Sequence, residues 1–368
     1  MKRLELLDYG RFLAALFVIA YHYLFNGIAN GKVSSVTHFS GVVDVAKYGY
    51  LGVEFFFMIS GYVIFFTANN KSAGQFLTSR AIRLFPAFWA AVIFTSCVAY
   101  FWGGDKMSVS LLQSIANLSM FPGIFGYSFV DGVYWTLAYE WKFYLLVFVI
   151  LVLGFQSKLR LFFTLWPFGI LLAGLITDYK LPYLSNYYSY FAAGALFAMR
   201  KDNKTIASLI SLSICLYLCI KFSLGQIVLH STPDVEYSKI VVASLIILLF
   251  LFFIFLNSNA GSSLKLSGSK LAGGLTYPIY LVHAHFGYMV LSKFANDENK
   301  IQIYCITLVT VLVVAYFIHT LIEQGLAKVW KPLFSQSIGR FGDFFQQKVS
   351  SIYTLLIAAR SKNRTEPY

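Results

Sequence analysis

Long apolar segments, each separated from the next by a short polar one, recur along the whole chain. A helix needs about 20 mainly apolar residues to cross the roughly 30 Å hydrocarbon core of a bilayer. The pattern therefore predicts an all-α membrane protein with ten transmembrane helices. We place them at residues 9–27, 50–68, 84–102, 135–155, 161–178, 184–200, 205–223, 239–257, 275–294 and 301–322.

Lysine and arginine are distributed unevenly between the loops that join these segments. Ten crossings place both termini on one side, and the loops on that side carry more basic residues than the opposite loops. Because cytoplasmic loops are enriched in these residues, both termini are predicted to be cytoplasmic. We expect residues 1–323 to form the membrane domain and residues 324–368 a basic cytoplasmic tail. Within the tail, residues 330–359 predict an amphipathic helix at the membrane surface, followed by a charged, disordered end.

The composition supports a bilayer as the solvent of this fold. Of the 368 residues, 58% are hydrophobic and only 12% are charged, whereas soluble domains are about 25% charged. A net charge of +13 would suggest nucleic-acid binding in a soluble protein, but basic cytoplasmic loops account for it here, and no nucleic-acid partner is expected. The cysteines all lie inside apolar segments without a Cys-x-x-Cys motif, so we expect neither a disulfide framework nor a metal site.

Two ionisable residues interrupt the first apolar segment. Arg11 and His22 are separated by eleven positions, so at about 100° per residue they lie on one helix face, about 16 Å apart along the axis. Asp8 lies one turn before Arg11 and is expected to pair with it. A charged side chain at the centre of a membrane helix costs about 2.5–3.5 kcal/mol of insertion free energy. A specific structural or functional role is therefore expected for this pair. Taken alone, it also fits a snorkelling arginine and a histidine bonded to a carbonyl.

Further charged residues lie at or inside the later segments. Arg80 and Arg83 fall in the loop between the second and third predicted helices, where two guanidiniums can hold phosphate oxygens. Ordinary cytoplasmic charge is the simpler explanation of that pair on its own. Glu54 and Glu140 are both predicted in the outer half of the membrane. Tyr144 follows Glu140 by one helical turn, and an interfacial aromatic belt explains the aromatic residues here but not Glu140.

The ninth segment adds His283, with Tyr280 one turn before it. A mechanism follows from these positions. A basic patch near the cytoplasm would hold the phosphates of an activated donor, and His22 with a nearby carboxylate would act as general base toward a hydroxyl from the other side. We take Glu140 as that carboxylate, on the hypothesis that it lies close to His22.

The chain resembles the acyltransferase 3 family of bacterial integral-membrane acyltransferases from about Leu6 to Glu323. Five motifs, in this order, carry the resemblance. They are Arg11-x10-His22, Gly52-Val-Glu54-Phe-Phe-Phe-Met-Ile-Ser60-Gly61, Arg80-x-x-Arg83-Leu-Phe-Pro86, Trp135-Thr-Leu-Ala-Tyr-Glu140-Trp-Lys-Phe-Tyr144 and Tyr277-Pro278-Ile-Tyr280-Leu-Val-His283. Many relatives carry aspartate where this chain has Glu54, which keeps the charge.

The resemblance implies a multi-pass protein of the bacterial inner membrane that uses acyl-CoA, most often acetyl-CoA, as a substrate and holds no permanent cofactor. Its acceptor would be a hydroxyl of a cell-envelope saccharide, such as an O-antigen, an exopolysaccharide or a lipid-linked glycan. The similarity is to the stand-alone kind, without an SGNH-type domain. Membrane lipids are the other expected partners, and the oligomeric state stays open.

Carried over residue by residue, the resemblance makes His22 and Glu140 the catalytic residues and Arg11, Arg80 and Arg83 the donor-binding residues. Supporting roles are expected for Asp8, Glu54, Trp135, Tyr144, Tyr280 and His283.

A secondary transporter of a small anionic or saccharide substrate is the alternative, because ten helices with charges inside the membrane also suit one. A glycan polymerase or ligase would need a large outer loop, and the loop at 103–134 is modest. The feature that separates an acyltransferase from a transporter is a cytoplasmic pocket for coenzyme A that meets an outer groove at His22.

Overall fold

The computed structural model describes residues 3–69, 71–179, 181–185, 187–230 and 235–362. These residues fold into helices and connecting loops, which confirms the all-α prediction. Within the described residues, eight helical segments are long and apolar enough to cross a membrane. They are Glu5–Ala29, Val43–Ala68, Ala73–Trp102, Gly132–Val152, Gln156–Ile176, Ile206–Val228, Lys239–Asn257 and Lys300–Gly325.

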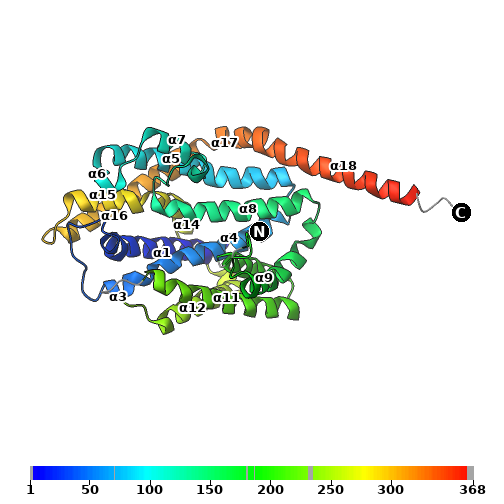
Figure 1. The fold of residues 1–368 in the computed structure, drawn as a ribbon, viewed down its shortest axis with the longest axis horizontal. Coiled ribbons are helices and arrows are strands. Elements are labelled where there is room, and N and C mark those ends of the chain that lie inside the picture. Colours follow the sequence, from blue (N-terminus) through cyan, green and yellow to red (C-terminus); the bar gives the residue numbers. More distant parts are fainter. Residues whose placement is uncertain (1–2, 70, 180, 186, 231–234, 363–368) are drawn as a thin grey trace.

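The long helices run side by side in one bundle (Figure 1). They are α1 (Glu5–Tyr21), α4 (Gly52–Ala68), α5 (Ala73–Trp102), α8 (Trp135–Val152), α9 (Leu159–Ile176), α10 (Tyr188–Asp202), α11 (Ile206–His230), α12 (Lys239–Asn257), α14 (Ser269–Val282), α15 (Ala284–Phe294) and α16 (Lys300–Phe317). Two predicted helices are not among the eight long apolar segments. The one at 184–200 corresponds to α10, which has only 15 residues, and the one at 275–294 corresponds to α14 and α15, which are separated at His283.

Helix α5 begins eleven residues earlier than the predicted helix at 84–102. Ser72 caps it, because the Ser72 side chain accepts a hydrogen bond from the backbone N–H of Gln75 while the Gln75 side chain accepts one from Ser72. The loop assignment of Arg80 and Arg83 is therefore wrong, since both lie inside α5. The polar residues of its first three turns, among them a threonine, a serine and the two arginines, interrupt the apolar pattern before residue 84, so a search for apolar segments misses this start.

Helix α10 is buried along most of its length and contacts α4, α9, α11 and α12. Its middle is built from small residues, which let helix backbones approach closely. A Cβ atom at Gly194 of α10 would overlap the carbonyl oxygen of Met58 in α4, and one at Gly61 of α4 would overlap the carbonyl oxygen of Phe191. These contacts fix α4, whose other residues line the cavities described below.

The segment that follows α16 is helical and packs back on α5. It comprises a π-helical turn (Ile318–Gly325), α17 (Ala327–Phe334) and α18 (Arg340–Lys362). Asp343 at the start of α18 accepts hydrogen bonds from the Ser72 hydroxyl and the Gly74 N–H. Helix α18 then extends past the end of the bundle (Figure 1). The tail helix predicted at 330–359 is divided between α17, a second π-helical turn (Ser335–Gly339) and α18. The end at 363–368, predicted to be disordered, lies outside the described residues.

The close approach of α4 and α10 gives a test. Gly194→Ala must push the two backbones apart, and overpacking of this kind costs about 1–3 kcal/mol. We expect a lower melting temperature for the purified protein in detergent, followed by tryptophan fluorescence. Gly225→Ala is the matched control, because Gly225 in α11 has no atom within 4 Å of the added Cβ and alanine favours a helix. Equal melting temperatures for the two variants would contradict this packing.

Candidate active site

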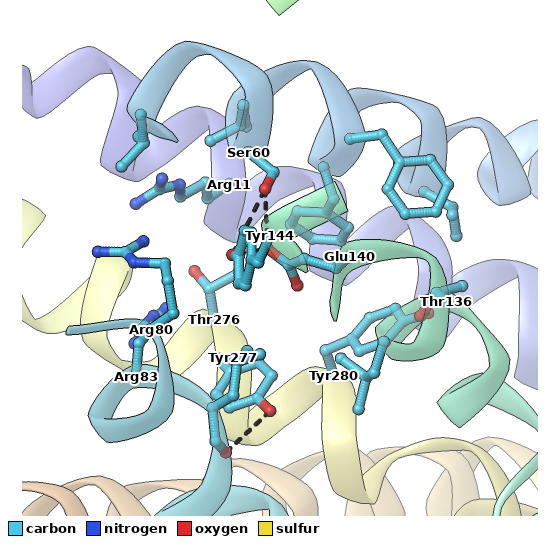
Figure 2. A pocket seen from close by; sticks show the side chains of 17 residues that line it. Arg11, Ser60, Arg80, Arg83, Thr136, Glu140, Tyr144, Thr276, Tyr277 and Tyr280 are labelled. Carbon is cyan, nitrogen blue, oxygen red and sulfur yellow. Dashed lines mark hydrogen bonds between the residues drawn. The ribbon is translucent and has the colours of Figure 1, made fainter. Parts of the chain in front are cut away.

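A cavity of about 220 Å³, here called the arginine cavity, lies between α1, α4, α5, α8 and α14. Its polar lining consists of Arg11, Ser60, Arg80, Arg83, Thr136, Glu140, Tyr144, Thr276, Tyr277 and Tyr280. Figure 2 shows the guanidinium groups of Arg11, Arg80 and Arg83 on one side of this cavity, and Tyr280 with Thr136 on the opposite side. The arginines of two sequence motifs therefore converge, although they are about 70 positions apart in the chain.

Arg11 enters the arginine cavity from the first turns of α1. Its Nη1 lies 3.9 Å from Oδ1 of Asp8, so the predicted pair is present. The other oxygen of Asp8 accepts a hydrogen bond from Nε of Arg3 at 2.7 Å. Asp8 thus divides one negative charge between two guanidiniums, and Arg11 keeps donors for a further anion.

Arg80 and Arg83 project from α5 into the same cavity and are incompletely paired. Nε of Arg80 donates to the Ser79 hydroxyl at 3.3 Å, and its guanidinium lies over the ring of Tyr144. Nη1 of Arg83 lies 3.6 Å from Oε1 of Glu323, and Oε2 of the same carboxylate lies 2.6 Å from Nδ1 of His319. Because each guanidinium has five N–H donors, both retain donors that an anionic ligand can use.

Glu140 also faces the arginine cavity. Its Oε1 accepts hydrogen bonds from the Ser60 hydroxyl at 2.9 Å and from the Tyr144 hydroxyl (Figure 2). Among the described residues no hydrogen bond joins Glu140 to His22, which lines a different cavity. The hypothesis that Glu140 lies beside His22 is therefore corrected. The outer half predicted for Glu140 gives only its depth in the membrane, and depth alone does not determine which cavity a helix face meets.

A second cavity of about 220 Å³, here called the histidine cavity, lies toward the opposite end of α1. Its polar and aromatic lining consists of Tyr21, His22, Asn26, Asn30, Lys32, Tyr50, Glu54, Trp135, Tyr187, Tyr280, His285 and Tyr288. The lining combines amide, ammonium, carboxyl and imidazole groups with several aromatic rings. This mixture can hydrogen-bond a hydroxyl-rich ligand and pack against its apolar faces.

His22 is the first residue of a π-helical turn, His22–Asn26, that follows α1. Its Nδ1 lies 2.5 Å from the Tyr288 hydroxyl, and the Asn26 amide donates to that same hydroxyl at 2.8 Å. The other ring nitrogen, Nε2, has no hydrogen-bond partner in the part of the chain that the structure describes. In the tautomer whose Nδ1–H donates to the Tyr288 hydroxyl, Nε2 carries the lone pair that can take a proton.

Two further histidines, His283 and His285, lie near His22 at the junction of α14 and α15. Nδ1 of His283 contacts the carbonyl oxygen of Tyr280 at 2.8 Å, and Nδ1 of His285 contacts that of Val130 at 2.8 Å. A carbonyl only accepts, so each Nδ1 carries a hydrogen and each Nε2 a lone pair. The His283 ring centroid lies 5.0 Å from that of His22, and the buried Nε2 of His283 has no partner within the described residues.

Lys32 reaches this cluster from the loop after α1. Its ammonium lies 2.6 Å from Nε2 of His285 and over the ring of Tyr288. Burial lowers the pKa of Lys32, and the nearby Asp131 carboxylate partly offsets that shift. Among the described residues no carboxylate lies within ion-pair distance of Lys32, so this ammonium remains available to a ligand.

Glu54 is the carboxylate that shares the cavity of His22. Its side chain is buried, with the residue only 3% exposed, and Oε2 has no hydrogen-bond partner within the described residues. A buried polar atom without a partner costs free energy unless a ligand or water satisfies it. Glu54 therefore marks a position where a hydrogen-bond donor of a ligand is expected.

The two cavities are adjacent and share Val53 of α4 and Tyr280 of α14 as lining residues. The predicted residues consequently separate into two groups. The arginine cavity contains Arg11, Arg80, Arg83, Glu140 and Tyr144, and the histidine cavity contains His22, Glu54 and Trp135. His283 contacts His22 without lining either cavity, and Asp8 lies behind Arg11.

Sequence reasoning missed Asn26, Lys32 and Tyr288. Asn26 follows His22 by four positions, so its place on the same helix face was a usable signal. Lys32 lies in a loop and contacts His285, and Tyr288 lies in α15 and contacts His22. In each pair the two residues are more than 250 positions apart in the chain. No periodicity or spacing indicates such contacts, which depend on how α15 packs against the π-helical turn His22–Asn26 and the loop after it.

Residues 4–320 match the family described as an acyltransferase domain, the acyltransferase 3 family. The chain is also 26% identical over 259 residues to the exopolysaccharide production protein ExoZ of Rhizobium meliloti (strain 1021). That similarity covers 67% of this chain and 78% of the relative. No solved structure matches the chain.

The wall of the histidine cavity gives a second test. Asp131 is fully buried and accepts hydrogen bonds from the N–H groups of Val133 and His285. In Asp131→Asn an amide NH₂ replaces one of the two acceptor oxygens. One of the backbone N–H groups then faces another donor and loses its hydrogen bond, at a cost of about 1–3 kcal/mol. We expect a lower melting temperature, whereas Asp105→Asn, on the exposed surface, should have no effect. If Asp131→Asn melts like the wild type, these hydrogen bonds do not hold His285.

Proposed function

We propose that this chain, which belongs to the acyltransferase 3 family, transfers an acyl group from acyl-CoA to a hydroxyl of a cell-envelope saccharide. The observation that carries the proposal is that an arginine-lined cavity and a histidine-lined cavity meet inside one membrane bundle. One cavity has the chemistry to bind a polyanionic donor, and the other has the chemistry to bind a hydroxyl-rich acceptor. The chain is a multi-pass membrane acyltransferase, and the donor and acceptor named here are proposals.

The donor is acyl-CoA, with acetyl as the expected acyl group, and it binds as a substrate. Its phosphates would contact Arg80 and Arg83, whose guanidiniums keep free donors, with Arg11 completing the cluster. Glu140 would act at this end, because its contacts to Ser60 and Tyr144 fix the ring beneath Arg80. We place this cavity on the cytoplasmic side of a bacterial inner membrane, where acyl-CoA is present.

The acceptor is a saccharide of the cell envelope, free or carried on a lipid. The rings of Trp135 and Tyr187 lie 5.2 Å apart and offer a surface for a sugar ring. The amide of Asn30, the ammonium of Lys32 and the carboxyl of Glu54 provide donors and acceptors for its hydroxyls. The exopolysaccharide relative agrees with an acceptor of this class.

The reaction needs one proton carrier between the two substrates. Nε2 of His22 would take the proton of the acceptor hydroxyl as its oxygen attacks the thioester carbonyl. A carbon–oxygen bond forms, the carbon–sulfur bond breaks, and the leaving thiolate of coenzyme A receives the proton from His22. Tyr288 and Asn26 would hold Nδ1 so that Nε2 faces the substrates. The acyl group passes directly from donor to acceptor, without an acyl-enzyme.

Transfer of label tests this function. Membrane vesicles from cells expressing the protein receive acetyl-CoA labelled in the acetyl group, and label in their polysaccharide is measured. His22→Ala removes the general base, so we expect about a 10²–10⁴-fold slower transfer. His38→Ala is the matched control, because His38 lies on Phe25 outside both cavities. Label that enters vesicles without reaching saccharide would favour a transporter and contradict the proposal.

The donor assignment has its own test. Arg80→Gln and Arg83→Gln each remove hydrogen bonds to a charged group, worth about 1.5–3 kcal/mol. We expect KM for acetyl-CoA to rise about 10- to 150-fold in each variant, with a smaller change in kcat. Lys270→Gln, which removes an exposed charge at the start of α14, is the control. An unchanged KM in both arginine variants would place the phosphates elsewhere.

A further inference from the structure

The two cavities share only two of their lining residues, Val53 and Tyr280. In the proposed reaction the donor binds at the arginines and the acceptor hydroxyl binds at His22. The acyl group must therefore reach the histidine cavity past these two side chains. Val53 and Tyr280 line both cavities. They therefore set the width of the passage between the cavities, where the thioester carbonyl would meet the hydroxyl.

Tyr280 is fixed on its side of this passage. Its hydroxyl lies 2.8 Å from the Thr136 hydroxyl and 3.3 Å from the carbonyl oxygen of Val133. Its ring packs edge-on against Phe56, with the centroids 5.6 Å apart. Contacts at both the hydroxyl and the ring prevent Tyr280 from moving aside for a larger acyl group.

Val53 is fixed through its backbone. The preceding residue, Gly52, packs so closely on α1 that a Cβ there would lie 2.8 Å from the carbonyl oxygen of Ala14 and 2.7 Å from a methyl group of Val18. Helix α4 therefore cannot move closer to α1 at this level to make more room. The volume next to Val53 is therefore determined by its side chain.

The passage also lies next to the proposed chemistry. The ring centroids of Tyr280 and His283 are 5.6 Å apart, and those of His283 and His22 are 5.0 Å apart. A carbonyl carbon held at Tyr280 is thus one aromatic ring away from His22. The carbons of the acyl chain beyond the carbonyl must fit between Val53 and Tyr280 in this position.

We propose that Val53 and Tyr280 select the length of the acyl chain, so that acetyl passes and longer acyl groups are excluded. The inference rests on the proposed function, because it assumes acyl-CoA in the arginine cavity. It extends that function by assigning the choice of acyl group to two named side chains. One methylene in a close-fitting apolar pocket changes kcat/KM by about 10- to 200-fold.

The experiment measures the transfer of label from acetyl-, propionyl- and butyryl-CoA into vesicle polysaccharide. Val53→Ala widens the passage, so the ratio of propionyl to acetyl transfer should rise about tenfold or more. Val53→Ile narrows it, so the same ratio should fall. Each ratio is taken within one preparation and therefore does not depend on how much of the variant is folded.

Val63→Ala is the matched control, because Val63 is on the same helix and lines the arginine cavity but not the passage. Its propionyl-to-acetyl ratio should equal that of the wild type, whatever its rate. Equal ratios in Val53→Ala, Val53→Ile and the wild type, or shifts of the same sign in both Val53 variants, would overturn the inference while the proposed function stands. Wild-type vesicles that incorporate label from none of the three donors would instead refute the proposed function.

Discussion

The burial of ionisable groups between apolar helices is the constraint on which this molecule depends. Each such group must find a partner, bind a ligand or cost free energy. Arg11 and Arg83 meet carboxylates at 3.9 and 3.6 Å, and Glu140 accepts two hydroxyl groups. Within the described residues, the buried ionisable groups with an atom that has no hydrogen-bond partner include Glu54, at Oε2, and His283, at Nε2. Nη1 of Arg160, which lines neither cavity, is another such atom. Glu54 lines the histidine cavity and His283 contacts His22, so two of these unsatisfied groups lie at the candidate active site.

Close helix packing makes this arrangement possible. Glycine and alanine in α10 bring α4 to the centre of the bundle, and Gly52 holds α4 against α1. Helix α4 then supplies Ser60 to the arginine cavity, Glu54 to the histidine cavity and Val53 to the boundary between them. The motif around Glu54 therefore serves three local purposes on one helix.

Much of this was predictable from the sequence, because helical periodicity is a local property. The common face of Arg11 and His22, the pair of Asp8 with Arg11 and the all-α fold follow from spacing and hydropathy. The start of α5 was missed because polar residues interrupt the apolar pattern of its first turns, which placed Arg80 and Arg83 in a loop. The partner of His22 was misjudged because membrane depth does not determine which face of α8 meets which cavity. Lys32 and Tyr288 depend on contacts between distant segments, which one sequence does not reveal.

In the proposed reaction the donor and acceptor sites meet at Val53 and Tyr280. An electron cryomicroscopy structure of the full chain in lipid nanodiscs with coenzyme A tests this most directly. We expect phosphate density at Arg80 and Arg83, with the thiol end next to Tyr280 and directed toward His22. Coenzyme A bound in the histidine cavity, or outside the helix bundle, would contradict it.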